Sequence, residues 1–429
     1  MRISVVGGGY VGLITSAGFA EKGHTVVCVD VDGDKVRQIN GKRSPIYEKQ
    51  LDSILESVVP KKLKASSNLE DAVLGSELTF ICVGTPSEDG GSVDLRYVRE
   101  VSEQIGRILK KKREYHLVVV KSTVVPGSTD GTVIPLLEKH SSKKAGKDFG
   151  VAMNPEFLRE GNAVEDFRNP DRIVIGSLDD RSGDILEKLY FEFKSPVLRV
   201  NLKTAEMIKY ASNSFLALKV SFINEVGNIC KKLGVDVYDV ARGVGLDHRI
   251  SPSFLRAGPG WGGSCFPKDV SALAYKANEV GVEPRMLNAA LEVNRDQPKV
   301  FVNLVKSRIK LKGKRAAVLG LTFKADTDDV RDSPAIPIIN LLLDEGANVV
   351  GYDPKGTENA KKILKNRIEY ASSVREALKD ADVALIVTEW AEFQKIDFSP
   401  MKTKRVFDSR KILNEDLLPE DVEYEGICW

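Results

Sequence analysis

The feature that most constrains the fold lies near the start of the chain, where a glycine-rich turn joins two apolar segments. Residues 3–6 are a short run of β-favouring residues, and GGGYVG at 7–12 and a small-residue segment that predicts a helix to about Lys22 follow directly. Residues 25–29 predict a second strand, which ends in Asp30. This order of strand, GxGxxG turn, helix, strand and acidic residue is typical of a dinucleotide-binding α/β unit.

The residue types of this turn suit a cofactor. Gly7, Gly9 and Gly12 would allow the tight turn, the approach of a pyrophosphate and close helix packing, and Asp30 would accept hydrogen bonds from the adenosine ribose. A carboxylate at that position repels a 2′-phosphate, so we expect NAD rather than NADP. The alternative is a glycine-rich turn without a ligand, which the two flanking strands and Asp30 disfavour.

Length and charge limit the class of protein. A chain of 429 residues is too long for one compact core, so we expect two or three domains. The 63 basic and 61 acidic residues give no overall charge that favours nucleic acid or an anionic membrane. No apolar run reaches membrane-spanning length, and a strand is expected from the first residues, so we expect neither a membrane span nor a signal peptide.

The cysteines indicate the redox environment. Their number is odd and they form no CxxC pair, which disfavours both a disulfide framework and a zinc site. We therefore expect a cytoplasmic protein without a metal. The five residues are Cys28, Cys82, Cys230, Cys265 and Cys428.

Two further predicted strands, at 78–83 and 117–120, end in loops that carry hydroxyl groups. Thr85 follows the first strand and Thr123 follows the second. Ligands of an open parallel sheet bind outside the carboxyl ends of its strands, so both threonines are candidates for the cofactor cleft. Thr85 is equally compatible with capping the next helix.

The segment VAMNPEFLRE at 151–160 places Glu156 and Glu160 four residues apart. If a helical turn follows Pro155, both carboxylates point the same way. The alternative is a solvent-facing acidic start of a helix, which the helix macrodipole favours. A strand at 172–175 is expected next.

A long helix is predicted from Leu202. Its polar residues Glu206, Lys209, Asn213 and Asn224 recur at steps that place them on one face, and 215–223 is largely apolar. A solvent-facing stripe is the simpler interpretation, but a buried helix would require partners for Lys209 and Asn213. Burial would also lower the proton affinity of Lys209, which suits acid and base chemistry.

The segment GPGWGGSCFPKD at 258–269 is the strongest candidate for chemistry. Its glycines let backbone approach a ligand closely, and they present the thiol of Cys265 followed by Lys268 and Asp269. A tight structural loop around a small buried cysteine is the competing interpretation. Helical spacing follows at 270–280 and 287–305.

A second α/β unit begins after the basic segment at 310–314. Strands are predicted at 315–319, 348–352 and 383–387, with a helix at 336–344. This half has no GxGxxG turn and offers Lys324 in the corresponding loop, so it should bind an anionic ligand other than a dinucleotide. The fold class expected for the whole chain is therefore α/β, with two Rossmann-like doubly wound domains joined by a central helical domain with a long connecting helix. The expected domains are 1–200, 201–310 and 311–429.

These motifs together resemble the UDP-glucose/GDP-mannose dehydrogenase family over essentially the whole chain. Those that carry the resemblance occur in family order: GGGYVG, CVGTP, KSTVVPG, NPEFLREG, the helix with Lys209 and Asn213, GPGWGGSCFPKD and GLTFKADTDDVRDSP. The glycine-rich cysteine segment is most similar to the UDP-glucose branch, with GDP-mannose as the alternative substrate. It differs from relatives that act on N-acetylated mannosamine.

The resemblance implies a four-electron oxidation of UDP-glucose to UDP-glucuronate with two NAD. Cys265 would form a thiohemiacetal and then a thioester, because a second hydride leaves an aldehyde only after a nucleophile has added. Lys209 and Asn213 would stabilise the oxyanion, Asp269 would position a base or water, and Thr123 and Glu156 would hold the proton-carrying water.

The resemblance also implies binding residues, a partner and an assembly. The cofactor set is Gly7, Gly9, Tyr10, Val11, Gly12, Asp30, Lys35, Thr85, Thr123, Glu160, Cys265, Lys268 and Arg331. The substrate set is Glu156, Leu158, Arg159, Glu160, Lys209, Asn213, Arg249, Phe254, Leu255, Arg256, Gly262, Phe323 and Lys324. Arg249 would reach a neighbouring subunit's site in a homodimer, although the residues around it match the family only in outline. Neither nucleic acid nor a membrane is expected as a partner.

Overall fold

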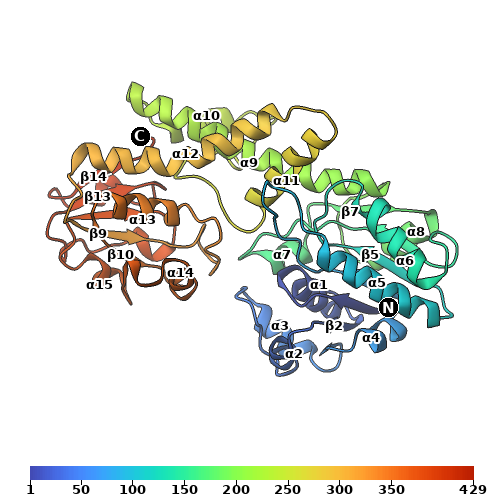
Figure 1. Ribbon diagram of the computed structural model, residues 1–429. Helices are drawn as coiled ribbons and strands as arrows, with labels where there is room; N and C mark the ends of the chain where they lie inside the picture. The colour runs from blue at the N-terminus through green and yellow to red at the C-terminus, as the bar shows by residue number, and fades with distance from the viewer. The chain divides into compact units, whose positions relative to one another are not determined.

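The computed structural model describes all residues from Met1 to Trp429 (Figure 1). The chain divides into two compact units, Met1–Ser212 and Asn213–Trp429. The division falls within the long helix α9 (Leu202–Leu233). None of the helices has the length and the apolar composition that a membrane span requires. The expected three-domain division stays a prediction.

The first unit is built on an eight-stranded sheet. The strand order is β3-β2-β1-β4-β5-β6-β7-β8, and all neighbours are parallel except β6 and β7. Val6 pairs with both Val29 and Ile81, so the carboxyl ends of the three central strands meet at one edge. The strands are β1 (Arg2–Val6), β2 (Thr25–Val29), β3 (Leu63–Ser66), β4 (Leu78–Ile81), β5 (Leu117–Val120), β6 (Gly150–Met153), β7 (Ile173–Ser177) and β8 (Val197–Val200).

Helices cover both faces of this sheet (Figure 1). One apolar core includes Phe19, Leu55 and Phe167 from α1, α3 and α7, and the other includes Ile105 and Leu137 from α5 and α6. The central strands are buried on both faces, which explains their nearly continuous apolar sequences. The helices are α1 (Tyr10–Glu21), α2 (Gly33–Asn40), α3 (Leu51–Val58), α4 (Leu69–Gly75), α5 (Arg96–Lys111), α6 (Ile134–Ser141), α7 (Ala163–Arg168) and α8 (Asp180–Leu189).

The second unit contains a six-stranded sheet with the order β11-β10-β9-β12-β13-β14, in which every pair is parallel. Alternate residues of β9 enter two different cores, with Val318 on one side and Leu319 on the other. The strands are β9 (Arg315–Leu319), β10 (Asn348–Tyr352), β11 (Glu369–Tyr370), β12 (Val383–Ile386), β13 (Arg405–Asp408) and β14 (Glu423–Gly426), and the helices are α13 (Ala335–Asp344), α14 (Thr357–Leu364) and α15 (Val374–Leu378). The prediction of two doubly wound sheets is confirmed.

Helices α9, α10 (Val237–Gly245), α11 (Phe266–Glu279) and α12 (Arg285–Arg308) lie between the two sheets in the sequence. Within the second unit, α12 packs against both α11 and α13. The loop between α10 and α11 contains the glycine-rich cysteine segment. The predicted helices starting at Leu202, Val270 and Leu287 are confirmed in outline, and α11 and α12 begin a few residues earlier than expected.

Candidate active site

The glycine turn of the first unit is shaped by close contacts. Gly7 has a positive φ of 104°, and a Cβ there would lie 2.7 Å from the carbonyl oxygen of Cys82. A Cβ on Gly12 would lie 1.7 Å from the carbonyl oxygen of Gly7. A Cβ on Gly9 would meet nothing within 4 Å, so this side of the turn is open. The turn therefore fits a group that approaches backbone at Gly9, as the pyrophosphate of NAD requires.

Asp30 stands at the end of β2 beside this turn. Its Oδ2 accepts a hydrogen bond from the Gly8 amide at 2.7 Å, and its Oδ1 accepts from the Asp32 amide at 2.9 Å. The Lys35 ammonium lies 3.9 Å from the same carboxylate. The structure thus fixes an anion next to the turn and leaves lone pairs on both oxygens for a ligand.

Thr85 and Thr123 are joined by a hydrogen bond. The buried Thr85 hydroxyl donates to the Thr123 carbonyl oxygen at 2.9 Å. The next helix, α5, begins only at Arg96, so the interpretation of Thr85 as a helix cap is wrong. The two loops that follow β4 and β5 are therefore linked at the carboxyl edge of the sheet.

Glu206 holds the end of the loop that carries Thr123. This buried carboxylate on α9 accepts hydrogen bonds from the amides of Gly127 at 2.5 Å and Thr129 at 2.8 Å. Burial raises the pKa of Glu206 although these bonds lower it. The polar face of α9 is thus buried at this point, as the sequence suggested, and it ties the helix to the β5 loop.

Lys209 and Glu156 form a buried ion pair. The Lys209 Nζ lies 2.9 Å from Oε1 of Glu156, and both side chains are about 95% buried. Burial alone would raise the pKa of Glu156, but the charge and hydrogen bond of Lys209 and the amide of Leu158 together lower it. Glu156 is therefore an ionised carboxylate inside the first unit, paired with the cation that the sequence selected.

The segment from Glu156 to Glu160 is not helical, so the condition under which Glu156 and Glu160 would point the same way is not met. Glu156 Oε2 accepts from the amide of Leu158 at 2.5 Å, a local bond that competes with helix formation. Arg159 is exposed and pairs with Asp166 at 2.5 Å. The amide of Gly161, the residue after Glu160, donates to the Tyr10 hydroxyl at 3.2 Å, which places the end of this segment beside the first residue of α1.

Lys121 is a buried cation that the sequence reading did not select. Its Nζ donates to Oδ1 of Asn154 at 2.9 Å, and that oxygen also accepts from the Tyr190 hydroxyl at 2.6 Å. Burial lowers the pKa of Lys121 to about 8. A lysine directly after an apolar strand is the signal that could have identified it.

In the second unit, the glycine-rich loop passes close to protein backbone. A Cβ on Gly262 would lie 2.0 Å from the Asp332 carbonyl oxygen, and a Cβ on Gly263 would lie 2.8 Å from the Phe323 ring. The Gly263 amide donates to the Arg331 carbonyl oxygen at 2.9 Å. These glycines are therefore required by the loop after β9, which carries several of the predicted binding residues.

Amide side chains of α9 and α12 hold the other side of the same loop. Asn294 accepts from the Trp261 amide at 2.7 Å and donates to the Trp261 carbonyl oxygen at 2.9 Å. The Gly258 amide donates to Asn224 at 2.8 Å, and Gln297 donates to the Gly258 carbonyl oxygen at 2.9 Å. These three amide side chains thus hold the backbone of the glycine-rich loop in place, and nothing in the sequence around them indicated that they would do so.

Cys265 is partly exposed at the N-terminal end of the 14-residue helix α11. Its Sγ lies 3.5 Å from the Ser264 hydroxyl. The N-terminus of a helix favours negative charge, so this position suits a thiolate. The thiol is not the fully buried apolar residue of the competing interpretation.

Asp269, one turn into α11, is 1% exposed and links two predicted site residues. Its Oδ2 accepts from the Asn213 side chain at 2.6 Å, and its Oδ1 lies 2.5 Å from the Lys268 ammonium. The sequence-selected residues Asn213, Lys268 and Asp269 are therefore in direct contact. Asn213 and Lys209 stand one turn apart on α9.

The remaining predicted residues of the second unit occupy two regions. Arg256 donates to the Arg410 carbonyl oxygen at 2.7 Å, and its neighbour Phe254 adopts a positive φ of 63°. Arg249 is exposed and pairs with Asp247 at 2.6 Å. Leu255 of the same segment is buried. In the loop after β9, Lys324 lies over the ring of Phe323 at 5.5 Å and Arg331 pairs with Asp329 at 2.6 Å.

Comparison with known proteins assigns each part of the chain. Residues 1–194 match the NAD binding domain of the UDP-glucose/GDP-mannose dehydrogenase family, residues 203–296 match its central domain, and residues 317–415 match its UDP binding domain. The UDP-glucose 6-dehydrogenase AglM of Haloferax volcanii is 45% identical over 100% of both chains.

Two of the similar solved structures illustrate the likeness over the whole chain. A UDP-glucose dehydrogenase from Pyrobaculum islandicum is 42% identical, with a TM-score of 0.94 over 100% of this chain and 97% of that one. A GDP-mannose dehydrogenase from Pseudomonas aeruginosa is 38% identical, with a TM-score of 0.58 over 100% of both chains.

Proposed function

The chain belongs to the UDP-glucose/GDP-mannose dehydrogenase family and is an NAD-dependent dehydrogenase, and from this premise we propose that it oxidises UDP-glucose to UDP-glucuronate. The observation that carries the proposal is Cys265 at the N-terminal end of α11, next to the contacts of Asp269 with Asn213 and Lys268. The similarity of the whole chain to curated UDP-glucose 6-dehydrogenases supports this substrate.

The proposed reaction has two oxidations and one hydrolysis. NAD, when bound, supplies the hydride acceptor for each oxidation. The C6 alcohol loses a proton and a hydride to become an aldehyde, and the Cys265 thiolate then adds to the aldehyde carbon. The resulting thiohemiacetal loses a second hydride and its hydroxyl proton, which leaves a thioester. Water cleaves the thioester to the carboxylate, and the thiol is released.

The charged residues have separate tasks in this scheme. The Lys209 ammonium and the Asn213 amide stabilise the oxyanions by charge and hydrogen bonding. Glu156, held ionised by Lys209, acts with Thr123 to hold the proton-carrying water. Asp269 orients Asn213 and positions a water for the thioester.

We propose binding roles for further residues, considered within each unit by itself. The second unit supplies Lys324 and Phe323 for the nucleotide, consistent with its match to a UDP binding domain. Arg331, Lys268 and Glu160 contribute to the cofactor. The other residues proposed for the sugar nucleotide are Leu158, Arg159, Arg249, Phe254, Leu255, Arg256 and Gly262.

The number of NADH formed per sugar tests this function. The full-length protein should form two NADH per UDP-glucose, and GDP-mannose or a UDP-N-acetylhexosamine should react at least about a hundredfold more slowly. Faster turnover of GDP-mannose would replace the substrate assignment and leave the family unchanged. One NADH per sugar would indicate an ordinary alcohol dehydrogenase.

Variants of Cys265 test the proposed nucleophile. Cys265→Ala should stop after the first oxidation, and Cys265→Ser should accumulate an ester, visible as added mass on the intact protein, because an oxygen ester hydrolyses more slowly than a thioester. The control is Cys230→Ala, the same change at a buried thiol of α9. Two NADH per sugar from Cys265→Ala, at the rate of the unmodified protein, would contradict the mechanism.

We also propose that the protein is a homodimer of the cytoplasm. Phe215, Phe222 and Ile229 recur every seven residues along α9, and all three are more than half exposed. Large exposed apolar side chains in such a row are typical of a helix that packs against a partner. Light scattering during size-exclusion chromatography should give twice the mass of 47.2 kDa. A Phe222→Glu variant should be monomeric.

A further inference from the structure

Glu48 is a buried carboxylate that joins the first residues of two helices in the first unit. It lies between α2 and α3 and is 6% exposed. Its Oε2 accepts hydrogen bonds from the Tyr10 hydroxyl and from the Gly161 amide at 2.8 Å. Its Oε1 accepts from the Ala163 amide at 2.9 Å. One side chain therefore binds three donors from two distant parts of the sequence.

The donors mark the start of α1 and of α7. Tyr10 is the first residue of α1, directly after the glycine turn, and Ala163 is the first residue of α7, directly after the segment that ends in Glu160. The two helices pack so closely that a Cβ on Gly18 would lie 2.2 Å from the Phe167 ring. Glu48 therefore bridges a tightly packed pair of helices at the ends that follow the two functional loops.

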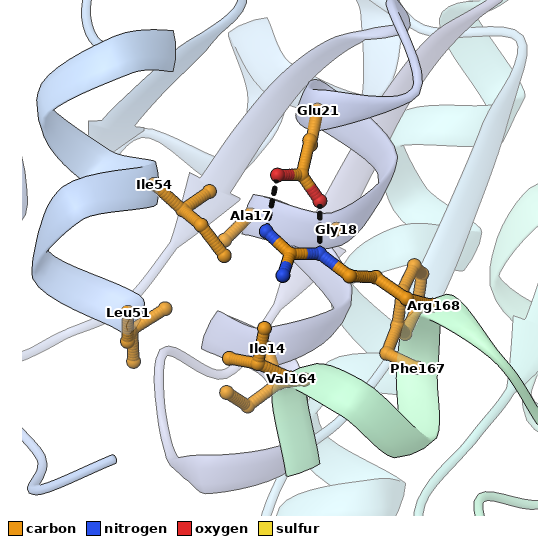
Figure 2. Close-up of a pocket in the computed structure, with 9 residues that line it drawn as sticks. All are labelled: Ile14, Ala17, Gly18, Glu21, Leu51, Ile54, Val164, Phe167 and Arg168. Carbon is orange, nitrogen blue, oxygen red and sulfur yellow. Dashed lines mark hydrogen bonds and ion pairs between the residues drawn. The ribbon is translucent and has the colours of Figure 1, made fainter. Parts of the chain in front are cut away.

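A second carboxylate bridges the same helices at their other ends. Glu21, the last residue of α1, lies 2.6 Å from the guanidinium of Arg168, the last residue of α7 (Figure 2). Figure 2 shows this pair among the residues that line a pocket, together with Ile14 and Val164. The pair lies far along both helices from the glycine turn. The helix pair thus has one bridge near functional residues and one away from them.

The bridge at Glu48 fixes Glu160 relative to the glycine turn. The Gly161 amide, immediately after Glu160, donates both to Glu48 and to the Tyr10 hydroxyl at 3.2 Å. The Tyr10 phenol in turn lies close enough to Glu160 for that carboxylate to raise its pKa, after the larger effects of burial and Glu48. A change in the acceptor at position 48 therefore alters hydrogen bonds at the ends of both loops.

We propose that Glu48 is a positioning residue that holds the glycine turn and the Glu156–Glu160 segment in the arrangement that NAD requires. The proposal concerns the NAD site and does not depend on which sugar nucleotide is oxidised. A glutamine in place of Glu48 has one acceptor oxygen and an NH₂ group, so it satisfies only one of the amides of Gly161 and Ala163. The other amide loses its partner, and the loop that contains it shifts.

Two matched variants of the full-length protein test the proposal by titration with NAD and by steady-state kinetics. Glu48→Gln should weaken NAD binding and raise KM for NAD about tenfold, because part of the binding free energy must then restore the arrangement of the two loops, with kcat changed about threefold at most. Glu21→Gln makes the same chemical change in the bridge between the same helices. It should lower Tm slightly and leave NAD affinity within about twofold.

A double-mutant cycle separates positioning from direct contact. Tyr10→Phe removes only the hydroxyl and should weaken NAD binding severalfold, and Glu48→Gln with Tyr10→Phe should be no weaker than Glu48→Gln alone. Additive losses would show that the two groups act independently and would overturn the proposal.

The remaining outcomes are also decisive. Unchanged NAD affinity in Glu48→Gln, with only a lower Tm, would reduce Glu48 to a structural bridge and overturn the proposal. If Glu48→Gln does not fold, Tyr10→Phe decides, because unchanged NAD affinity in that variant also contradicts the link. Failure to oxidise UDP-glucose would contradict the proposed function, whereas the NAD titrations would still test Glu48.

Discussion

The two sheets of this molecule begin with the same strand, turn and strand, and their turns are built alike. Gly7 and Gly320 follow the first strands with positive φ values of 104° and 94°. The Gly7 amide donates a hydrogen bond to the carbonyl oxygen of Val29, at the end of β2, at 2.7 Å. The Gly320 amide donates in the same way to the carbonyl oxygen of Tyr352, at the end of β10, at 2.8 Å. The two halves therefore share the backbone plan that brings a turn to the carboxyl edge of a sheet.

Each second strand is followed by an aspartate, Asp30 in the first half and Asp353 in the second, and the two carboxylates differ in how many further hydrogen bonds they can accept. Asp30 takes hydrogen bonds from two amides. Asp353 is 3% exposed, and both of its carboxylate oxygens accept hydrogen bonds. Its Oδ2 accepts from the amide of Leu321, from the amide and hydroxyl of Thr322, and from the indole of Trp390. The hydrogen bonds that Asp353 accepts all come from protein groups and stabilise its own loop, whereas Asp30 has lone pairs left that can accept hydrogen bonds from a ligand. This difference agrees with the match of one half to an NAD binding domain and of the other to a UDP binding domain.

The helices after the two turns also start differently. In the first half α1 begins at Tyr10, directly after the turn, so its N-terminus faces the position of a pyrophosphate. In the second half α13 begins only at Ala335. The intervening loop carries Phe323 and packs against Gly263 of the cysteine segment. The same strand order is thus followed by a dinucleotide-type turn in one half. In the other half it is followed by a long loop that packs against the segment carrying Cys265.

The largest effect is expected at Gly12, which has no counterpart in the second half. Gly12→Ala places a Cβ 1.7 Å from the Gly7 oxygen, so α1 must shift, Tm should fall, and kcat/KM for NAD should drop about a hundredfold or more. Gly9→Ala has space for its methyl group, so it should keep Tm and raise KM for NAD, because the methyl group obstructs the pyrophosphate. Melting curves and NAD titrations measure both, and a Gly12→Ala variant with normal NAD affinity would contradict this account.

The next effect concerns stability and compares the two carboxylates. Asp353→Asn leaves several buried donors with poor partners and should lower the free energy of unfolding by about 3 kcal/mol. Asp30→Asn disturbs fewer bonds and should cost about 1 kcal/mol. Denaturant unfolding followed by fluorescence measures the difference. Equal losses in the two variants would remove the contrast between a structural and a ligand-binding carboxylate.

Local sequence signals were sufficient for the first two strands of each half and for the turn between them, but not for the strands β3, β6, β8, β11, β13 and β14. The strands at Thr25–Val29, Leu117–Val120, Arg315–Leu319 and Asn348–Tyr352 have the predicted bounds, because their apolar runs end at glycines or charged residues. The burial of Lys209 and Asn213 was also expected, but the apolar stretch from which it was inferred is not itself buried, because Phe215 and Phe222 are more than half exposed. Patterns within one element are readable because its periodicity decides which face is buried.

Contacts between distant segments could not be predicted. Nothing near Asn294 or Glu48 in the sequence indicates that these side chains bind the backbone at Trp261 and Gly161. The helical turn considered after Pro155 does not form, and the short bond from the Leu158 amide to the Glu156 carboxylate that occurs there has no periodic signature in the sequence. The partners of a polar side chain are set by the folded topology, which sequence patterns define only coarsely.

A smaller effect is expected on cofactor choice, where only the first half should respond. The carboxylate of Asp30 repels a 2′-phosphate, so the unmodified protein should strongly prefer NAD to NADP. Asp30→Asn removes the charge, so the ratio of kcat/KM for NAD to kcat/KM for NADP should fall about tenfold. Asp353→Asn should leave this ratio unchanged for the molecules that are folded. Equal activity of the unmodified protein with NAD and NADP would contradict the assignment of Asp30.

The smallest effect distinguishes the halves by their response to acid. His116 of the first half is buried and hydrogen-bonded to Thr79 at 2.7 Å, and burial together with Lys112 lowers its pKa to about 3. Asp408 of the second half is also buried, and burial raises its pKa. The two groups therefore change the free energy of unfolding in opposite directions as the pH falls.

The sign for His116 follows from proton binding. Between about pH 6.5 and the lowered pKa, unfolded His116 binds a proton that the native imidazole does not, so the native state loses stability as the pH falls, by about 1.4 kcal/mol per pH unit at most. His116→Gln removes this contribution and should flatten the decline of Tm between about pH 6.5 and pH 4, with His248→Gln, at an exposed site, as the control. Thermal unfolding across that range measures both slopes. If His116→Gln declines as steeply as the unmodified protein, the acid sensitivity of the first half arises from its carboxylates, and the buried imidazole contributes no contrast between the halves.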